Sequence, residues 1–399
     1  MDIKIENFRS IQNESVHLAP ITLLYGPNGA GKSSLIYALL TLKNILLSPN
    51  RQPSELFNFQ AINLGGYDAV VFDHQPRNKI LLRFSVQNGP FIFSYEVQFG
   101  KSDALFRLEI QDEQDTFVRL EIPAAFPYSL TDSASAKMLY KGNEFTVSWN
   151  GIAAQAQPVE SSPETHTQAT ELTSLIYSSF ESLRSAGFVP LQRGFFKFQY
   201  GAVSVSPAII TEDEVATLLA NERYLTARVS YYLEKIVGRD FRVHTAPGTA
   251  LFSLNATDKT TGIASELVND GFGINQLIFF LARALHHDTE LIYIEEPEVH
   301  LHPSALRKLA AAVVDITRQE HKRFLISTHS EAFLLAFLSQ VANKDVTPSE
   351  LACYLVQKDG KVTHFERQQV NEDGQVEGGL SSFMEGELED IMAFFGQSG

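Results

Sequence analysis

The apolar residues of this chain recur at two different spacings, and these spacings predict where its strands and helices lie. Residues 3–8 alternate between apolar and polar, which is typical of a half-buried strand. Two more short apolar strands are predicted at 16–18 and 21–25. From 33 to 47 the apolar residues follow helical spacing, which stops before Ser48-Pro49-Asn50. The chain therefore opens as strands followed by one apolar helix.

The middle of the chain is predicted to be rich in strands and then helical. The predicted strands, separated by Asp, Asn, Gly and Pro turns, cover 69–72, 80–87 and 91–99, with weaker ones at 105–110 and 117–122. Residues 153–173 are rich in Gln, Ser, Thr and Pro without periodicity, so we expect a mobile loop there. Helical spacing at 172–183 and 222–237 predicts a helical lobe.

The last third alternates between apolar strands and amphipathic helices. The predicted elements are short strands at 242–246 and 251–254, a buried helix at 277–285, a strand at 291–295, a helix at 303–320, a strand at 324–327 and a helix at 331–341. A strand pair at 351–357 and 361–367, an acidic loop and a last helix follow. This alternation is the βαβ rhythm of a parallel sheet, so the predicted fold class is α/β.

Composition narrows the class of protein. Of the 399 residues 44% are apolar and 20% charged, as in an ordinary globular protein. Arg283 interrupts even the apolar run at 277–285, so we expect no membrane span and no membrane partner. Cys353 is the only cysteine, which favours a reducing cytoplasmic location. The net charge of −15 argues against a basic coat for nucleic acid, although a local basic groove stays possible.

The stretch GPNGAGKSS at Gly26–Ser34 lies between the strand at 21–25 and the helix after it. This spacing of glycines, lysine and serine is the phosphate-binding loop of nucleoside triphosphatases, in which backbone N–H groups, Lys32 and the helix N-terminus surround phosphate oxygens. The hydroxyl of Ser33 can ligate Mg²⁺. A Gly-rich turn with an incidental lysine is the alternative interpretation. The residues expected to contact ATP are Gly26, Asn28, Gly29, Gly31, Lys32, Ser33 and Ser34.

A second motif begins where the apolar strand Leu291–Ile294 ends in Glu295-Glu296-Pro297-Glu298. Adjacent carboxylates at a strand end can hold Mg²⁺ and activate water in a phosphate-loop enzyme. We expect Glu295 to hold the metal and Glu296 to act as general base. The alternative is an acidic start to the helix at Pro303.

Two further patterns complete the candidate chemistry. His329 ends the strand at 324–327 and is placed to sense a γ-phosphate, whereas a lone strand-end histidine is otherwise a polar cap. The run Asn269–Gln276 is a Gly-rich turn that opens a helix, and an ordinary helix-capping loop is the alternative interpretation. His300 and His302, spaced by one residue without a third ligand nearby, are expected to pack and donate hydrogen bonds instead of holding a metal.

The order of these motifs resembles the ABC-type ATPase heads of the RecF/SMC superfamily. More narrowly, the chain is similar to the AAA-family ATPases related to the overcoming-lysogenization-defect (OLD) proteins. The similar segments are the opening Ile3–Ile36, the neighbourhood of Tyr67, FVPLQR at Phe188–Arg193 and VNDGFGINQ at Val268–Gln276. The resemblance implies a P-loop NTPase of ABC-ATPase head type with a β-rich N-terminal lobe and a helical insertion lobe. The implied division of the single head 1–399 is 1–100, 101–240 and 241–399.

The resemblance also implies roles for residues. Lys32 and Ser33 would bind phosphate and Mg²⁺, and Glu295 and Glu296 would be the metal-binding and catalytic acids. Asn269–Gly271 would be the signature that faces a partner subunit's nucleotide, and His329 the switch histidine. Glu at 295 replaces the commoner Asp, and Asn at 269 replaces the commoner Ser. Gln60 is one candidate for the Q-loop glutamine.

The function implied by the resemblance is ATP hydrolysis by a head-to-tail homodimer in DNA repair or in defence against phage and plasmids. OLD nucleases carry a Toprim domain, for which the residues after His329 leave no room, so we expect a separate nuclease or toxin as effector. The apolar stripe from Phe383 to Phe395 is expected to pack on the chain's own core, and a docking surface for a basic partner is the alternative. The alternative function is an ATP-gated clamp on DNA, which a basic groove including Arg9, Arg51 or Arg77 would favour. A transporter subunit is a third possibility.

Overall fold

The structure is a computed structural model of the chain. It describes residues 1–48, 52–59, 62–111, 116–125, 133–206, 209, 211–245, 248–377 and 379. Two compact units share the chain. The first unit comprises Met1–Leu18, Ser33–Ser185 and Lys358–Phe365, and the second comprises Ala19–Lys32, Ala186–Gln357 and the residues from Glu366 onward. Gln60 and the predicted last helix with its stripe from Phe383 to Phe395 lie outside the described residues.

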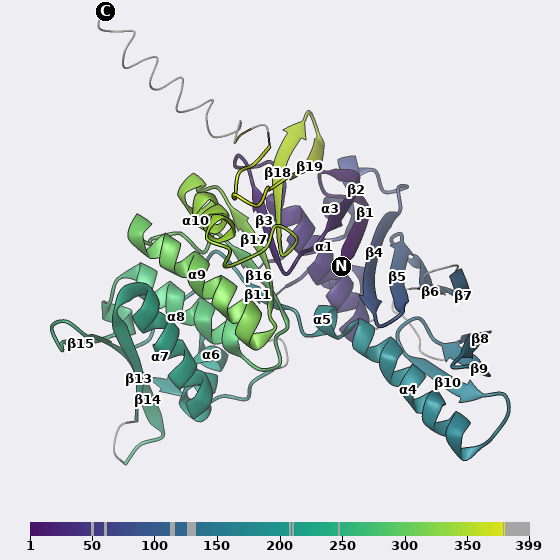
Figure 1. Cartoon of the computed structure of the whole chain (residues 1–399), viewed down its shortest axis with the longest axis horizontal. Coiled ribbons are helices and arrows are strands. Elements are labelled where there is room, and N and C mark those ends of the chain that lie inside the picture. Colours follow the sequence, from purple (N-terminus) through teal and green to yellow (C-terminus); the bar gives the residue numbers. More distant parts are fainter. Residues whose placement is uncertain are drawn as a thin grey trace, which may run out of the picture. The chain divides into compact units, whose positions relative to one another are not determined.

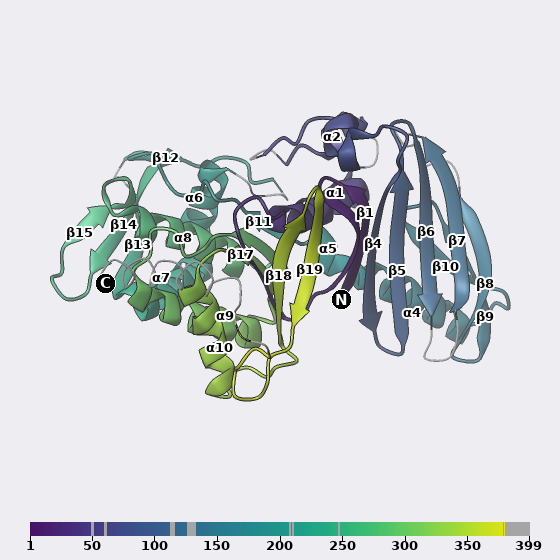
Figure 2. The ribbon, with the colours of Figure 1, turned by 90° about the horizontal axis from the view of Figure 1, so that it is seen from above.

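The first unit contains a six-stranded antiparallel sheet in the order β2-β1-β4-β5-β6-β7 (Figure 2). Its strands are β1 (Asp2–Phe8), β2 (Ile11–His17), β4 (Ile80–Asn88), β5 (Phe91–Phe99), β6 (Asp103–Gln111) and β7 (Thr116–Ala125). One face is apolar, with Phe84, Tyr95 and Phe106 fully buried. The other face carries an ion-pair network in which Arg107 bridges Glu96 and Glu121. Alternation of apolar and polar residues therefore fixes the register of this sheet.

The segment from Ala134 to Arg184 differs most from the sequence prediction. It forms a three-stranded sheet of β8 (Ala134–Tyr140), β9 (Asn143–Trp149) and β10 (Ala154–Pro158), followed by helices α4 (Pro163–Ser179) and α5 (Glu181–Arg184). The predicted loop at 153–173 is wrong, because Ala154 and Ala156 alternate with exposed glutamines along β10. Ser162 and Thr165 then form a capping box that starts α4.

Around α1 (Lys32–Leu47) lie the short helices α2 (Pro53–Leu56), α3 (Tyr67–Val70) and η1 (Phe72–His74). The predicted strand at 69–72 is therefore wrong. Gly66 caps α3, which buries Tyr67 and Val70 on one side as a helical turn does. The Tyr67 hydroxyl donates to the Asn78 carbonyl oxygen, which holds α3 against the start of β4.

The second unit is built on a six-stranded sheet in the order β11-β16-β17-β3-β18-β19 (Figure 1). The strands are β3 (Ile21–Tyr25), β11 (Gly187–Val189), β16 (Leu291–Glu295), β17 (Arg323–Thr328), β18 (Leu351–Asp359) and β19 (Val362–Gln368). From β11 to β18 all neighbours pair in parallel. The helices that accompany these strands are α8 (Phe272–Leu285), α9 (Pro303–Glu320) and α10 (Glu331–Ala342). The βαβ alternation predicted for this region is confirmed.

Beside the parallel sheet, the second unit contains helices and a small antiparallel sheet. The helices are α6 (Glu212–Asn221), α7 (Arg223–Val237) and η2 (Leu267–Asn269), and the strands are β12 (Tyr200–Gly201), β13 (Arg239–Thr245), β14 (Leu251–Asp258) and β15 (Ala264–Glu266). Helix α8 is almost wholly buried, and its apolar residues join one core with those of α7 and β16. Among the described residues, no helix is long and apolar enough to cross a membrane.

Candidate functional site

Three neighbouring strands of the second unit end at the same edge of its sheet. In the register of β17 with β3, Thr328 lies opposite Tyr25, and in that of β16 with β17, Glu295 lies opposite Ser327. Parallel strands place their carboxyl ends at one edge, so the residues that follow each strand are brought together. Those residues are the phosphate loop after β3, the acidic run after β16 and His329 after β17.

The loop that follows β3 depends on glycine at its first position. Gly26 has φ +139°, and a Cβ placed there would lie 2.2 Å from the carbonyl oxygen of Val356 in β18. Gly29 and Gly31 have φ +78° and +105°, a region that side chains rarely adopt. The loop therefore takes the curled path that the motif predicts, and Asn28 is exposed at its tip.

Lys32, the first residue of α1, folds back onto the loop. Its Nζ donates to the carbonyl oxygens of Gly26 at 2.8 Å and Pro27 at 3.0 Å. Burial lowers the pKa of this ammonium group, while Glu296 and Glu298 act in the opposite direction. Lys32 therefore interacts electrostatically with the acidic run. Ser33 and Ser34 follow in the first turn of α1.

The acidic run is held by a buried arginine that the sequence analysis did not assign. The guanidinium of Arg193 donates to the carbonyl oxygens of Glu295 and Glu296, each at 2.8 Å, and to that of Pro190 at 2.9 Å. Burial lowers the pKa of Arg193 to about 10, against the opposing charges of the nearby glutamates, so it stays protonated at neutral pH. Arg193 thus positions the backbone of both acids.

Glu296 itself has an unusual backbone. Its φ is +44°, in the left-handed region that is uncommon for residues other than glycine, and its N–H donates to the Ser327 carbonyl oxygen at 2.8 Å. Its carboxylate oxygen Oε1 lies 3.2 Å from His329 Nδ1. Backbone strain of this kind concentrates at functional sites. The structure therefore brings Glu296 and His329 together, as the motif order implies.

Glu298 is a third carboxyl group at the edge, and it received no role from the sequence. It is buried and accepts a hydrogen bond from the Thr328 hydroxyl, whose oxygen also accepts from Ser330 N–H at 3.0 Å. Burial raises the pKa of Glu298, while the bond from Thr328 acts to lower it. The signal in the sequence was the acidic pattern EEPE, in which only the first two residues were assigned.

The Gly-rich turn forms the start of α8. Asn269 and Gly271 are exposed, and Gly271 is the N-cap. Asp270 Oδ1 accepts from Gly271 N–H at 2.8 Å, and Asn275 in the helix clamps Phe195 by accepting from its N–H at 2.6 Å and donating to its oxygen at 2.8 Å. The turn is thus tied to the segment that follows Arg193.

His300 and His302 have structural partners. The ring of His300 packs on that of Phe272 with centroids 5.8 Å apart, and His302 Nδ1 accepts from Ser304 N–H at the N-terminus of α9. The backbone oxygen of His300 would lie 2.4 Å from a Cβ at Gly273. Neither histidine belongs to a group of metal-ligating side chains among the described residues. Both histidines therefore make packing or hydrogen-bonding contacts of the kind that the sequence predicts.

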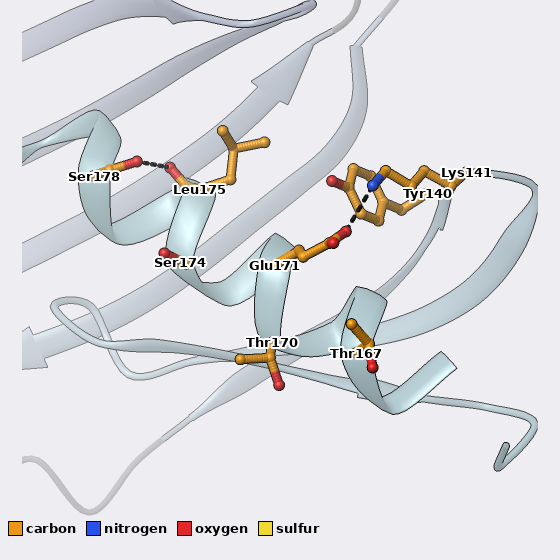
Figure 3. A pocket seen from close by; sticks show the side chains of 8 residues that line it. All are labelled: Tyr140, Lys141, Thr167, Thr170, Glu171, Ser174, Leu175 and Ser178. Carbon is orange, nitrogen blue, oxygen red and sulfur yellow. Dashed lines mark hydrogen bonds and ion pairs between the residues drawn. The ribbon is translucent and has the colours of Figure 1, made fainter. Parts of the chain in front are cut away.

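A groove in the first unit lies apart from these motifs in the sequence. It runs between the β8–β9 hairpin and α4, and Lys141 spans it to reach Glu171 at 2.6 Å (Figure 3). Hydroxyl groups of Thr167, Thr170 and Ser174 line its other side. None of the predicted site residues contributes to this groove.

Comparisons with known proteins agree with the fold and the motifs. A family described as "AAA domain, putative AbiEii toxin, Type IV TA system" matches residues 21–336, and the chain belongs to this family. No curated protein matches the chain.

One solved SMC head shares the fold, and two others are similar at lower TM-scores. An SmcHead bound to the C-winged helix domain of ScpA covers 93% of this chain and 98% of its own, with TM-score 0.52 and 12% identity. The SMC head of Thermotoga maritima covers 92% and 97% with TM-score 0.44 and 9% identity. The Smc head from Pyrococcus furiosus, bound to the C-terminal domain of ScpA, covers 98% of both chains with TM-score 0.46 and 10% identity.

The chain is therefore an AAA-family protein with an SMC-head-like α/β fold. The predicted AAA family and the predicted α/β fold of ATPase-head type are confirmed.

The buried carboxyl of Glu298 predicts a pH dependence of stability. Its pKa in the folded chain lies above the ordinary value of about 4.3, so between these two values the folded state holds a proton that the unfolded state releases. Wild-type stability should therefore fall, relative to Glu298→Gln, as pH rises through this window. Urea midpoints measured from about pH 4 to 8 check this.

Two variants of the neighbouring threonine serve as a matched pair. Thr328→Val removes the hydroxyl that favours the ionised carboxyl of Glu298, so the pH range over which stability falls should widen. Thr328→Ser keeps a hydroxyl and should resemble wild type. A constant difference between wild type and Glu298→Gln across the range would contradict the assignment.

Proposed function

We propose that this chain hydrolyses ATP at the edge formed by β3, β16 and β17. The observation that carries the proposal is the pairing of Glu296 with His329 at 3.2 Å beside the phosphate loop, on a backbone that Arg193 holds. A carboxylate fixed at a strand end and oriented by a second group is the arrangement that a general base requires. The family description names an AAA domain, which supports the same proposal.

The residues divide the work of binding and proton transfer. The phosphate oxygens of ATP are surrounded by the backbone N–H groups of Gly29 and Gly31 and by the N-terminus of α1. Lys32 gives up its hydrogen bonds to the loop carbonyl oxygens and donates to the β and γ phosphates. Glu296 accepts a proton from the attacking water, and His329 contacts the γ-phosphate and orients that carboxylate. Asn28 and Ser34 complete the loop that encloses the nucleotide.

The donors at this edge also fit Mg²⁺, which prefers oxygen ligands. The Ser33 hydroxyl at the start of α1 and the buried Glu295 carboxylate at the end of β16 would hold the ion. Bound Mg²⁺ supplies charge neutralisation to the phosphates. The protein's own part is to hold Glu295, which Arg193 does through the carbonyl oxygen of that residue.

We propose that two chains associate head to tail, each placing its Asn269–Gly271 turn over the partner's nucleotide. The turn is exposed at the N-terminus of a long buried helix, where backbone N–H groups and the helix dipole favour phosphate. A side chain added at Gly271 would meet no atom within 4 Å, so this surface is open in the single chain.

The biological role that we propose is a sensor or regulator in defence against phage or plasmids, or in DNA repair, inside the cytoplasm. The family description names a toxin and a Type IV toxin–antitoxin system, which supports a role in defence. The effector, a nuclease or toxin, would be a separate protein that the ATP-bound dimer controls. Loss of bound ATP would then release or restrain that effector.

The hydrolysis proposal predicts different effects for two substitutions. Lys32→Ala should abolish ATP binding because the only described ammonium on the loop is lost. Glu296→Gln should keep ATP binding and lower kcat by about 100- to 10,000-fold, the usual contribution of a general base. Equilibrium binding of ATP and steady-state phosphate release measure the two effects. The exposed control Glu372→Gln should leave both unchanged, and wild-type turnover in Glu296→Gln would refute the assignment.

The dimer proposal predicts rescue between two inactive variants. Lys32→Ala disables one loop, and Gly271→Asp places a negative charge at the turn without a clash in its own chain. A mixture forms hybrid dimers in which one intact loop faces one intact turn, so phosphate release should exceed that of either parent. Turnover by the wild-type chain that stays constant per subunit down to monomeric concentrations would argue against the sandwich.

The effector proposal predicts that the purified chain cleaves no nucleic acid. Incubation with DNA or RNA, ATP and Mg²⁺ or Mn²⁺ should leave both polymers intact on a gel, and expression without neighbouring genes should be neither toxic nor protective. Cleavage that co-purifies with the chain would overturn the regulator role. Retention of DNA by ATP-bound Glu296→Gln protein would instead favour the alternative, an ATP-gated clamp of RecF type.

A further inference from the structure

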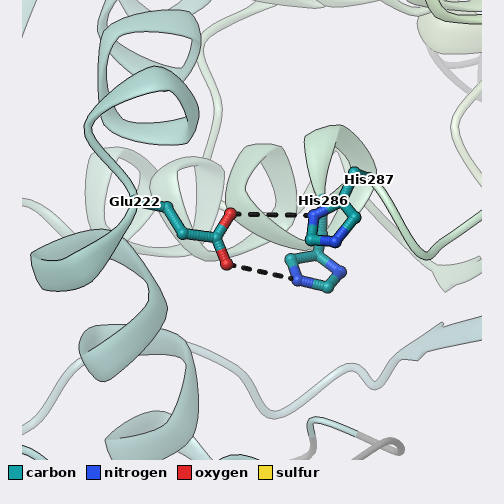
Figure 4. Close-up of side chains that lie close together, drawn as sticks. All are labelled: Glu222, His286 and His287. Atoms are coloured by element: carbon teal, nitrogen blue, oxygen red, sulfur yellow. Dashed lines mark ion pairs between the residues drawn. The ribbon is translucent and has the colours of Figure 1, made fainter.

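A cluster of possible metal ligands lies in the second unit, on residues to which no role was given above. Glu222 sits between α6 and α7, and His286 and His287 follow the last residue of α8 (Figure 4). The ligand atoms of these three side chains lie within 4.8 Å of one another. Two chain segments more than sixty residues apart therefore converge on one point.

Glu222 lies too far from both imidazoles for direct hydrogen bonds. The two carboxylate oxygens of Glu222 point at the two imidazoles, at 3.6 Å from His286 Nε2 and 3.8 Å from His287 Nδ1 (Figure 4). Hydrogen bonds between nitrogen and oxygen are about 2.7–3.2 Å long. Tetrahedral ligands at about 2.0–2.2 Å from Zn²⁺ are, by geometry, roughly 3.3–3.6 Å apart. The observed separations are thus close to those of groups that share an ion.

The surroundings of His287 favour the same interpretation. Its other ring nitrogen, Nε2, lies 3.1 Å from Asp288 Oδ1. Histidines that bind a metal commonly donate their second N–H to a carboxylate, which fixes the tautomer and leaves the first nitrogen with its lone pair. Asp288 therefore directs the lone pair of His287 toward Glu222.

His286 is held rigidly at the same point. Its side chain is 4% exposed, its Nδ1 has no hydrogen-bond partner, and the buried Lys322 donates to its backbone oxygen at 2.9 Å. Its Nε2 is the ring nitrogen that faces Glu222.

We propose that Glu222, His286 and His287 form a binding site for a divalent transition metal, with Zn²⁺ as the ion that best matches two imidazoles and one carboxylate. Three protein ligands and one water are the coordination of sites that remain open to solvent. Glu222 and His287 are 32% and 70% exposed, so the ion and its water reach the site from outside. The ion joins the end of α8 to the α6–α7 junction.

This site has a consequence for the turn at the other end of α8. Gly271 caps the N-terminus of the helix whose last residue, Leu285, precedes the two histidines. A metal that fixes the end of α8 restricts the helix that carries the Asn269–Gly271 turn. The binding site does not depend on the proposed ATPase activity, because it shares no residue with the phosphate loop edge.

Binding of Zn²⁺ to the full chain tests the proposal. Competition with a chromophoric chelator should reveal one site that Glu222→Gln or His287→Ala weakens at least tenfold. Asp288→Asn should weaken it about 10- to 100-fold, the usual effect of losing the carboxylate behind a metal-bound histidine. His244→Ala removes an exposed histidine of β13 and serves as the matched control, with unchanged affinity expected. Added Zn²⁺ should raise the Tm of wild type more than that of His287→Ala.

Co²⁺ provides a spectroscopic signature that loose surface binding lacks. Wild type loaded with Co²⁺ should show the intense visible bands of tetrahedral coordination by nitrogen and oxygen, and Glu222→Gln should lose them. His287 and Glu222 are partly exposed, so both variants should fold, which circular dichroism checks. Equal Zn²⁺ affinity in wild type, Glu222→Gln and His287→Ala would overturn the proposal, whatever the ATPase activity.

Discussion

Parallel pairing of β16, β17 and β3 is the constraint on which the candidate site depends. The pairing fixes Glu295 opposite Ser327 and Thr328 opposite Tyr25, so three short segments remote in sequence must end at one edge. A slip of one residue would turn each side chain to the other face of the sheet. Arg193 then adds a cross-link that strand pairing alone does not give, because it binds the backbone beyond the last paired residue of β16.

The sequence predicted the parts of the site that have strict local patterns. Glycine spacing in the phosphate loop and carboxylates after an apolar strand are consequences of local chemistry, and the structure brings both to the same edge. Arg193 was named only as part of a similar segment, because its role rests on carbonyl oxygens of residues about a hundred positions away. Thr328 and Glu298 were missed for the same reason: their partnership exists only after β16 and β17 pair.

The fold prediction failed where polar residues form regular structure. In β10 the buried positions are alanines, which carry too little apolar area to reveal an alternating pattern beside glutamine. Helix α4 is rich in Thr, Ser and Gln and is started by a capping box, so its signal was in the cap and not in periodicity. β11 has only three residues, and its place at the sheet comes from pairing with β16. Tertiary contacts decided each of these elements.

The position of β3 in its sheet has a consequence for folding during synthesis on the ribosome. β3 is complete at residue 25, yet its two neighbours, β17 and β18, begin at residues 323 and 351. Ribosomes add about 5–20 residues per second, so roughly 15–60 s pass between the synthesis of β3 and that of β17. During this interval the apolar strand β3 has neither of its neighbours in the sheet. The backbone of Gly26 also lies against the carbonyl oxygen of Val356. The phosphate loop therefore takes its final path only after Val356 has left the ribosome. A ribosome that stalls before β17 is made therefore carries a strand that is open to mispairing.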